Sequence, residues 1–120
     1  MKFLFTIFHD EQTLDDMPEP EMQALVDAAL DYDEEIRRSG HYIVSNALQR
    51  ARTARTLRVR GGKVSVTDGP FAETKEQLGG YYLIECDNLD QAIEAAARIP
   101  AAQGGTIEVR PVMKIDMPPG

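Results

Sequence analysis

The chain has 120 residues and a mass of 13.4 kDa, which is the size of a single domain. Its 42% hydrophobic and 28% charged residues are typical of a folded protein, and they exclude a disordered chain or a collagen-like repeat. The 13 Lys and Arg against 20 Asp and Glu give a net charge of −7. This charge argues against nucleic acid or an anionic membrane as a partner, because both are bound through clustered basic side chains.

The chain starts with a predicted strand, which is followed by a long amphipathic helix. Residues 2–8 are rich in Phe, Leu and Ile, as strands are, and this apolar run ends at His9, too early for a secretory signal. No segment stays apolar over the roughly 20 residues of a membrane span, so we expect a cytoplasmic protein. From Glu21 to Arg38 apolar residues recur at helical spacing, and Gly40 supplies the residue that closes such a helix.

The second half of the chain contains mostly strands. They are predicted at 42–48, 81–86 and 106–112, with a hairpin at 56–67 and a second helix after Asp87-Asn88. The hairpin follows from two alternating runs on either side of Gly61-Gly62. The helix follows from Asn88 as an N-cap, with Gln91 as its capping-box partner.

This order of elements predicts an α+β fold, namely a ferredoxin-like βαββαβ sandwich with an inserted β-hairpin. We expect one domain over residues 1–113 and a C-terminal tail over 114–120. The first strand and the strand at 81–86 are apolar on both faces, whereas helices in such a fold cover only one face. We therefore predict a homodimer in which a second copy covers the other face; the alternative is that the loop at 70–78 folds over it.

The run VTDGPFAETKEQLGGYYLIE at 66–85 is the most specific motif of the sequence. It resembles the signature of the DGPF branch of the YCII-related proteins, and the resemblance extends to residues 39–41, 95–100 and 107–112. The resemblance implies a dimeric α+β barrel built from ferredoxin-like protomers. It also implies an association with extracytoplasmic-function sigma factors, since members of this branch are often encoded beside them or fused to them.

Some relatives in the wider YCII group are similar to small lyases or dehalogenases that act on hydroxylated aromatic rings through a His–Asp pair. This chain has no histidine in the helix at 21–38, where those relatives carry one. Asp68 of the DGPF motif is the candidate general base or histidine partner, although Asp before Gly-Pro also caps its own turn. His9 and His41 are the only histidines, so both are candidate catalytic residues, and His41 is preferred because it lies within the family pattern.

Candidate ligand contacts come from the last strand and from the motif. Glu108 and Arg110 share a strand face opposite Ile107 and Val109, and they are expected to point into the cleft between protomers. There Arg110 would hold an anionic ligand, or Glu108 and Arg110 would form a structural pair. The full set of expected ligand-binding residues is Arg110, Glu108, Tyr81 and Phe71.

No metal site and no cofactor are expected. The two histidines lack metal-ligand spacing, and the single Cys86 lies in an apolar strand, as a buried and unreactive thiol would. The hairpin carries the one basic patch, which protects an edge strand or docks an acidic partner; it consists of Arg55, Arg58, Arg60 and Lys63.

Two functions therefore follow from the sequence. The first is binding of a small polar or aromatic ligand in the barrel cleft, with lyase- or hydrolase-like acid/base chemistry. The alternative is a non-catalytic ligand-binding or regulatory module associated with an extracytoplasmic-function sigma factor. Turnover separates the two, and the sequence leaves open whether the protein is an enzyme.

Overall fold

The computed structural model describes residues 1–115, and its elements confirm the predicted mixed α+β class. The expected tail at 114–120 falls mostly outside the described residues. The elements are β1 (Lys2–His9), α1 (Glu11–Asp15), α2 (Glu19–Arg38), β2 (Tyr42–Ala47), β3 (Arg55–Arg60), β4 (Lys63–Asp68), β5 (Gln77–Glu85), α3 (Leu89–Ala97) and β6 (Thr106–Pro111), with short 3-10 turns η1 (Ala51–Thr53) and η2 (Pro100–Gln103).

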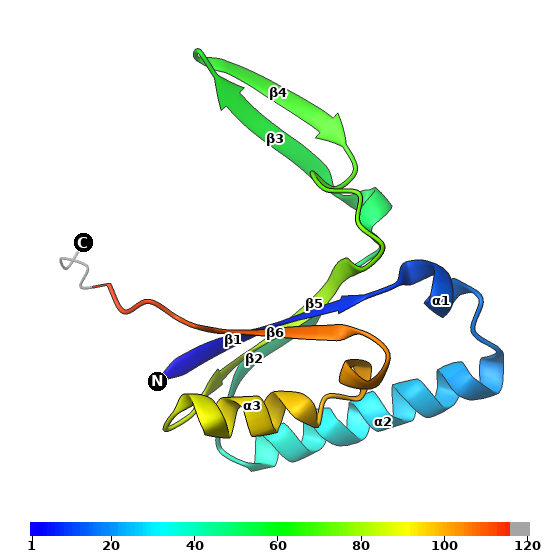
Figure 1. The fold of residues 1–120 in the computed structure, drawn as a ribbon, viewed down its shortest axis with the longest axis vertical. Helices are drawn as coiled ribbons and strands as arrows, with labels where there is room; N and C mark the ends of the chain where they lie inside the picture. Colours follow the sequence, from blue (N-terminus) through cyan, green and yellow to red (C-terminus); the bar gives the residue numbers. More distant parts are fainter. Residues whose placement is uncertain (116–120) are drawn as a thin grey trace.

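Four strands form one antiparallel sheet in the order β2-β5-β1-β6, and β3 and β4 form a separate two-stranded sheet. Helices α2 and α3 both cover the same face of the larger sheet (Figure 1). Phe5 and Ile84 point to this helix-side face. Leu4 and Leu83, which pair across β1 and β5, point to the opposite face, which we call the open face.

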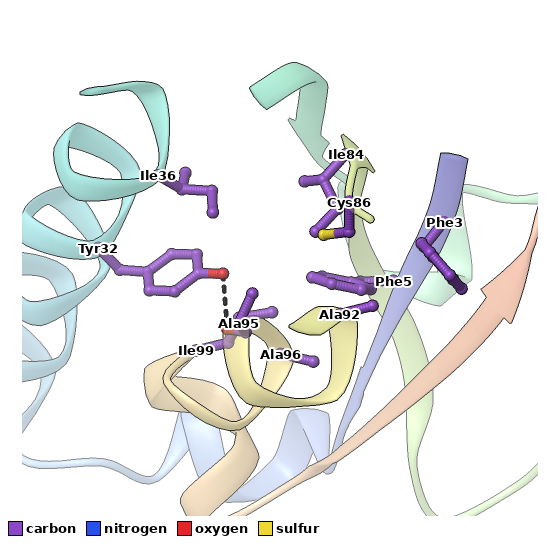
Figure 2. Packing of buried hydrophobic residues seen from close by; sticks show 10 residues of the cluster. All are labelled: Phe3, Phe5, Tyr32, Ile36, Ile84, Cys86, Ala92, Ala95, Ala96 and Ile99. Atoms are coloured by element: carbon purple, nitrogen blue, oxygen red, sulfur yellow. Dashed lines mark hydrogen bonds between the residues drawn. The ribbon is translucent and has the colours of Figure 1, made fainter. Parts of the chain in front are cut away.

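The hydrophobic core lies between the helix-side face and the two helices (Figure 2). Phe3, Phe5, Ile36 and Ile84 are at most 1% exposed. Helix α3 contributes mainly alanines, which let its backbone approach the sheet closely. The Tyr32 hydroxyl reaches into this core and donates a hydrogen bond of 2.8 Å to the Ala95 carbonyl, so its burial leaves no unpaired donor.

Local elements differ from the sequence prediction in three places. The strand predicted at 81–86 starts earlier, at Gln77, since Gln77, Leu78 and Gly80 also pair with β1. The short helix α1 was not predicted; Asp10 caps it by accepting from the Gln12 amide. Asn88 caps α3 as predicted, but the Gln91 side chain accepts from the amide of Asp87 rather than from that of Asn88.

Strands β3 and β4 form a hairpin, as predicted, and this hairpin projects from the body of the molecule (Figure 1). We call residues 55–68 the arm. Gly61 and Gly62 both have positive φ, as a tight two-residue hairpin turn requires. The radius of gyration is 16.8 Å, against about 14 Å for a compact domain of this length, which reflects the projecting arm.

The loop between the arm and β5 does not bury its aromatic residue. Phe71 is 81% exposed, so the predicted alternative, in which this loop covers an apolar face of the sheet, gains no support from its side chain. Among the described helices, none is both long and apolar enough to cross a lipid bilayer.

Candidate functional site

His9 lies at the end of β1, where an irregularity in the sheet makes room for its ring. The pairing of β1 with β5 shifts between Ile7 and Phe8, which leaves Gly79 out of the regular register. The His9 ring occupies the space beside Gly79 where a β-carbon would otherwise lie. Glycine at position 79 is therefore what allows this ring to rest against the sheet.

The His9 ring borders a cavity of about 610 Å³ between the helix-side face and α2, which we call the helix-side cavity. This volume lies in the range of known small-molecule sites, about 300–1,000 Å³. Its walls are mainly apolar and come from α1, α2 and η2 as well as from the sheet. The apolar side chains include Ile7, Leu14, Met22, Leu25, Ala29, Ile99, Pro100 and Ala101.

The cavity exists because α2 is longer than the core that it covers. Tyr32 and Ile36, in its C-terminal half, are buried against α3 and the sheet. Val26 and Leu30, further toward the N-terminus, belong to the same helix but remain exposed, and both border the cavity. The N-terminal half of α2 therefore forms a wall of the cavity instead of closing onto the sheet.

His9 is the polar group best suited to act on a molecule in this cavity. Its ring is partly buried and makes no hydrogen bond with any of residues 1–115. Burial lowers the pKa of His9 below its ordinary value of 6.5, and the Arg50 guanidinium lowers it further, against the opposing carboxylates of Glu11 and Glu76. At neutral pH the ring is therefore uncharged, and one of its nitrogens is a free hydrogen-bond acceptor.

The end of the cavity beside His9 is held by contacts between α1 and the segment after β2. Arg50 forms an ion pair of 2.9 Å with Asp15, and Glu11 accepts a hydrogen bond of 2.9 Å from the Ala51 amide. Because acidic groups outnumber Arg50 around His9, this end of the cavity does not favour an anionic ligand.

A second polar group lies further along the cavity. The Tyr82 hydroxyl donates to Asp33 at 3.3 Å, and Asp33 also pairs with Arg37 at 2.7 Å. Burial raises the pKa of Tyr82, and the neighbouring Asp33 carboxylate raises it further, so the hydroxyl stays protonated at neutral pH. Tyr82 packs edge to face against Tyr32, with 5.5 Å between ring centroids, which orients its hydroxyl.

The two histidines lie at opposite ends of the sheet. His9 pairs with Gln77 at the start of β5, whereas the His41 carbonyl accepts from the Glu85 amide at the end of that strand. The ring of His41 is also engaged there: its Nδ1 donates to the Glu85 carbonyl oxygen at 2.8 Å. Of the two candidates, His9 is therefore the one that lies at a cavity with a free ring.

Asp68 is not joined to either histidine within one chain. It ends the arm, its side chain is 88% exposed, and it forms an ion pair of 3.1 Å with Arg55. Within residues 1–115, no hydrogen bond or ion pair links Asp68 to His9 or His41, and none links its carboxylate to a backbone amide of its own turn. Within the described residues, Asp68 therefore neither pairs with a histidine nor caps its own turn, and its role as a general base stays a prediction.

The predicted ligand contacts are also spread over the molecule. Ile107 and Val109 pack on the core as expected, and Glu108 and Arg110 pair with each other at 2.7 Å on the other side of β6. The Tyr81 hydroxyl accepts a hydrogen bond of 2.8 Å from Asn46, and Tyr81 borders the helix-side cavity. Phe71 lies on the exposed loop.

Comparison with known proteins decides the family. The sequence profile of the YCII-related domain matches residues 1–116, nearly the whole chain. The chain belongs to the YCII-related family. It is also 52% identical over 61 residues to a protein of Rhizobium meliloti (strain 1021) described as uncharacterised, and this match covers 49% of each of the two chains.

The described part of this YCII-related protein contains neither a candidate metal site nor an exposed thiol. Residues 1–115 contain no cluster of three or more His, Cys, Asp or Glu side chains that could hold a metal. Cys86 is buried in the core, and burial raises the pKa of its thiol, which keeps it protonated.

Several residues of the cavity were not predicted from the sequence. Asp33 lies in α2, Tyr82 in β5 and Arg50 in the segment before η1, and the three share no local motif. Gly79 lies outside the strand predicted at 81–86, although it belongs to β5 and accommodates the His9 ring. The available signal was the pair Gly79-Gly80 at the start of an otherwise apolar strand, which is typical of a bulge or of a close approach to a strand.

Proposed function

We propose that this YCII-related protein binds a small, largely apolar and uncharged ligand in the helix-side cavity, with His9 accepting a hydrogen bond from a hydroxyl group of the ligand. The observation that carries this proposal is the partly buried, unpaired and uncharged His9 ring at a mainly apolar cavity of about 610 Å³. An apolar body with one hydroxyl group matches such a cavity, because the lining offers mostly hydrocarbon and His9 offers one free acceptor.

The same ring would serve as the proton acceptor if the ligand is a substrate. An uncharged imidazole with a lowered pKa accepts a proton from a hydroxyl or an activated carbon, and such a step is the start of lyase- or hydrolase-like chemistry. The Tyr82 hydroxyl, whose proton is donated to Asp33, would accept a hydrogen bond from the same ligand through its oxygen. The alternative is a non-catalytic ligand-binding or regulatory module, which would bind in the same cavity without turnover, for example beside a sigma factor.

For the assembly we propose a homodimer in which the open faces of two sheets meet, as in a dimeric α+β barrel of ferredoxin-like protomers. The strand order β2-β5-β1-β6 with antiparallel neighbours supports this protomer, because the two βαβ crossovers then interleave. The apolar side chains of Leu4 and Leu83 on the uncovered face support the pairing. The motif at 66–85 supports membership of the DGPF branch.

Binding of β-naphthol and of its methyl ether tests the proposed role of His9. The two probes share one ring system, and only β-naphthol carries a hydroxyl hydrogen. We expect β-naphthol to bind about fivefold to tenfold more tightly, since one hydrogen bond to His9 is worth about 1 kcal/mol. His9→Phe is expected to abolish this preference while the methyl ether binds as before, as measured by titration of probe fluorescence.

The matched control is His41→Phe, which makes the same change at the far end of the sheet and should leave both affinities unchanged. An equal preference for β-naphthol in wild type and in His9→Phe would refute the role of His9. A kinetic assay on hydroxylated ligands that bind then separates an enzyme from a binding module.

The titration of His9 gives a second prediction. Folding lowers the pKa of His9 below the unfolded value of 6.5. At a pH between the folded and the unfolded pKa, the folded state therefore binds fewer protons than the unfolded state. The stability that comes from the uncharged ring is thus complete above pH 6.5 and is lost as the pH falls through the folded pKa. We expect an NMR titration of the imidazole protons, with His9→Phe to assign the signal, to give a midpoint below 6.5; a midpoint at or above 6.5 would contradict burial of the ring.

A further inference from the structure

The arm is an amphipathic ribbon whose apolar face is uncovered. Its register pairs Leu57 with Val66 and Val59 with Val64, which places four aliphatic side chains on one face. These side chains are between 52% and 65% exposed. A two-stranded hairpin is only marginally stable alone in water, and an exposed apolar strand pair promotes association with other chains. The apolar face of the arm therefore needs a covering surface.

The chain as a whole exposes more surface than a compact monomer does. Its accessible surface is 8794 Å², whereas a folded monomer of its mass exposes about 6,500 Å². The excess exceeds the roughly 800 Å² that each partner buries in a standard protein interface. The exposed segments of the chain, the arm among them, thus leave enough area for a stable dimer.

The two uncovered apolar surfaces lie on the same side of the molecule. In Figure 1 the arm leaves the sheet on the side opposite α2 and α3, which is the side of the open face. Leu4, Leu83 and Val44 lie on that face by their register. A body that rests on the open face would therefore also meet the arm.

Charge identifies the covering body. Residues 51–68 contain five of the 13 Lys and Arg but one of the 20 Asp and Glu, so this segment carries a net charge of +4 and the rest of the chain −11. The basic side chains Arg58 and Arg60 share the arm face opposite the aliphatic one. A second copy of this chain therefore attracts the arm through its net negative charge and offers it an apolar sheet face, whereas nucleic acid would be repelled by the rest of the chain.

We propose that the arm of each protomer clasps a second copy of this chain, with the apolar face of Leu57, Val59, Val64 and Val66 packed against the partner and with Arg58 and Arg60 on the outer face of the arm. The inference rests on the homodimer proposed above and adds that the arm, and not only the sheet, makes the interface. An acidic protein of another kind would be attracted to the same basic residues, but it has no counterpart to the open face beside the arm.

Light scattering on matched arm variants tests this interface. Wild type is expected to have twice the 13.4 kDa mass of one chain at micromolar concentration. Val66→Asp should raise the dimer dissociation constant about 100-fold or more, because a carboxylate would be buried without a partner. Thr67→Asp introduces the same charge at the next residue, on the opposite face, and should remain dimeric. A dimeric Val66→Asp, or loss of the dimer in both variants, would overturn the assignment of the apolar face.

A tryptophan in the arm gives an independent readout, because the chain contains no Trp. In Val59→Trp we expect the emission to shift to the blue as the protein concentration rises and the arm becomes buried. Emission at the fully solvated wavelength in a dimeric sample would show that the arm stays free, and it would overturn the proposal even if Val66→Asp had disturbed the fold of the arm.

A variant of the sheet separates this proposal from the homodimer itself. Leu83→Asp places a charge on the open face and is expected to give folded monomers by circular dichroism and light scattering. Monomeric Leu83→Asp with a dimeric Val66→Asp would leave the homodimer standing and refute the clasping arm. A monomeric wild type at micromolar concentration would refute both.

Discussion

Replacing Gly79 with alanine is expected to weaken β-naphthol binding by about tenfold to 100-fold, which would be the largest loss of binding from a change outside the polar groups of the cavity. A β-carbon at position 79 would overlap the His9 ring, so the ring must leave its place against β5. The ligand then loses its acceptor, and the displaced ring occupies part of the cavity. Gly79 is in this sense a positioning residue for His9.

The matched control is Gly104→Ala, because a β-carbon at Gly104 meets no atom within 4 Å. We expect Gly104→Ala to bind β-naphthol with the affinity of wild type. Binding of the methyl ether gives a second criterion for the role of Gly79. In Gly79→Ala the preference for β-naphthol over the ether should disappear. If Gly79→Ala kept that preference together with wild-type affinity, the His9 ring would not be the acceptor.

The second large effect is expected on stability. Phe5→Ala should lower the free energy of unfolding by about 3–5 kcal/mol, because Phe5 is 0% exposed and its removal leaves a cavity at the centre of the sheet. This is a large part of the roughly 5–15 kcal/mol that stabilises a typical domain. Urea unfolding followed by circular dichroism, at one fixed protein concentration, measures the change.

Phe71→Ala removes the same ring from the exposed loop and provides the comparison. The Phe71 side chain is 81% exposed, so its removal breaks few contacts. The change in the free energy of unfolding should therefore stay within about 0.5 kcal/mol. A cost for Phe71→Ala similar to that for Phe5→Ala would show that this loop is buried in the assembled protein, and it would return Phe71 to the set of contact residues.

Elements with a strong local pattern could be predicted from the sequence. The apolar stripe from Glu21 to Arg38 and the turn at Gly61-Gly62 are set by residues a few positions apart, and both elements are present with nearly the predicted bounds. The strand at 81–86 was predicted too short, since its start depends on pairing with β1, which lies far away in the sequence. Local periodicity contains no information on such pairing.

The candidate site could be predicted only in part, for the same reason. His9 was one of two candidate histidines, and nothing in the sequence shows that its ring rests on Gly79 while the ring of His41 is engaged by the Glu85 carbonyl. The ion pair of Arg50 with Asp15 joins residues that are 35 positions apart. Asp68 attracted interest through its motif, yet it lies at the base of the arm with Arg55. Motifs indicate the family, whereas the cavity depends on long-range packing.

The attachment of the arm has a consequence for how the chain responds to change. The chain leaves the body after β2 and returns to β5, the strand beside it, and a hydrogen bond from the Gly69 amide to the Ala54 carbonyl closes the base of the arm. Strands β2 and β5 are neighbours in the sheet and could be joined by a short turn. Instead, the arm is inserted between them as a nearly independent unit. Such a unit opens without unfolding the sheet, so its amide hydrogens exchange by local fluctuation and those of β1 only by global unfolding. Insertions, deletions and substitutions in the arm can therefore alter assembly while the body keeps its fold.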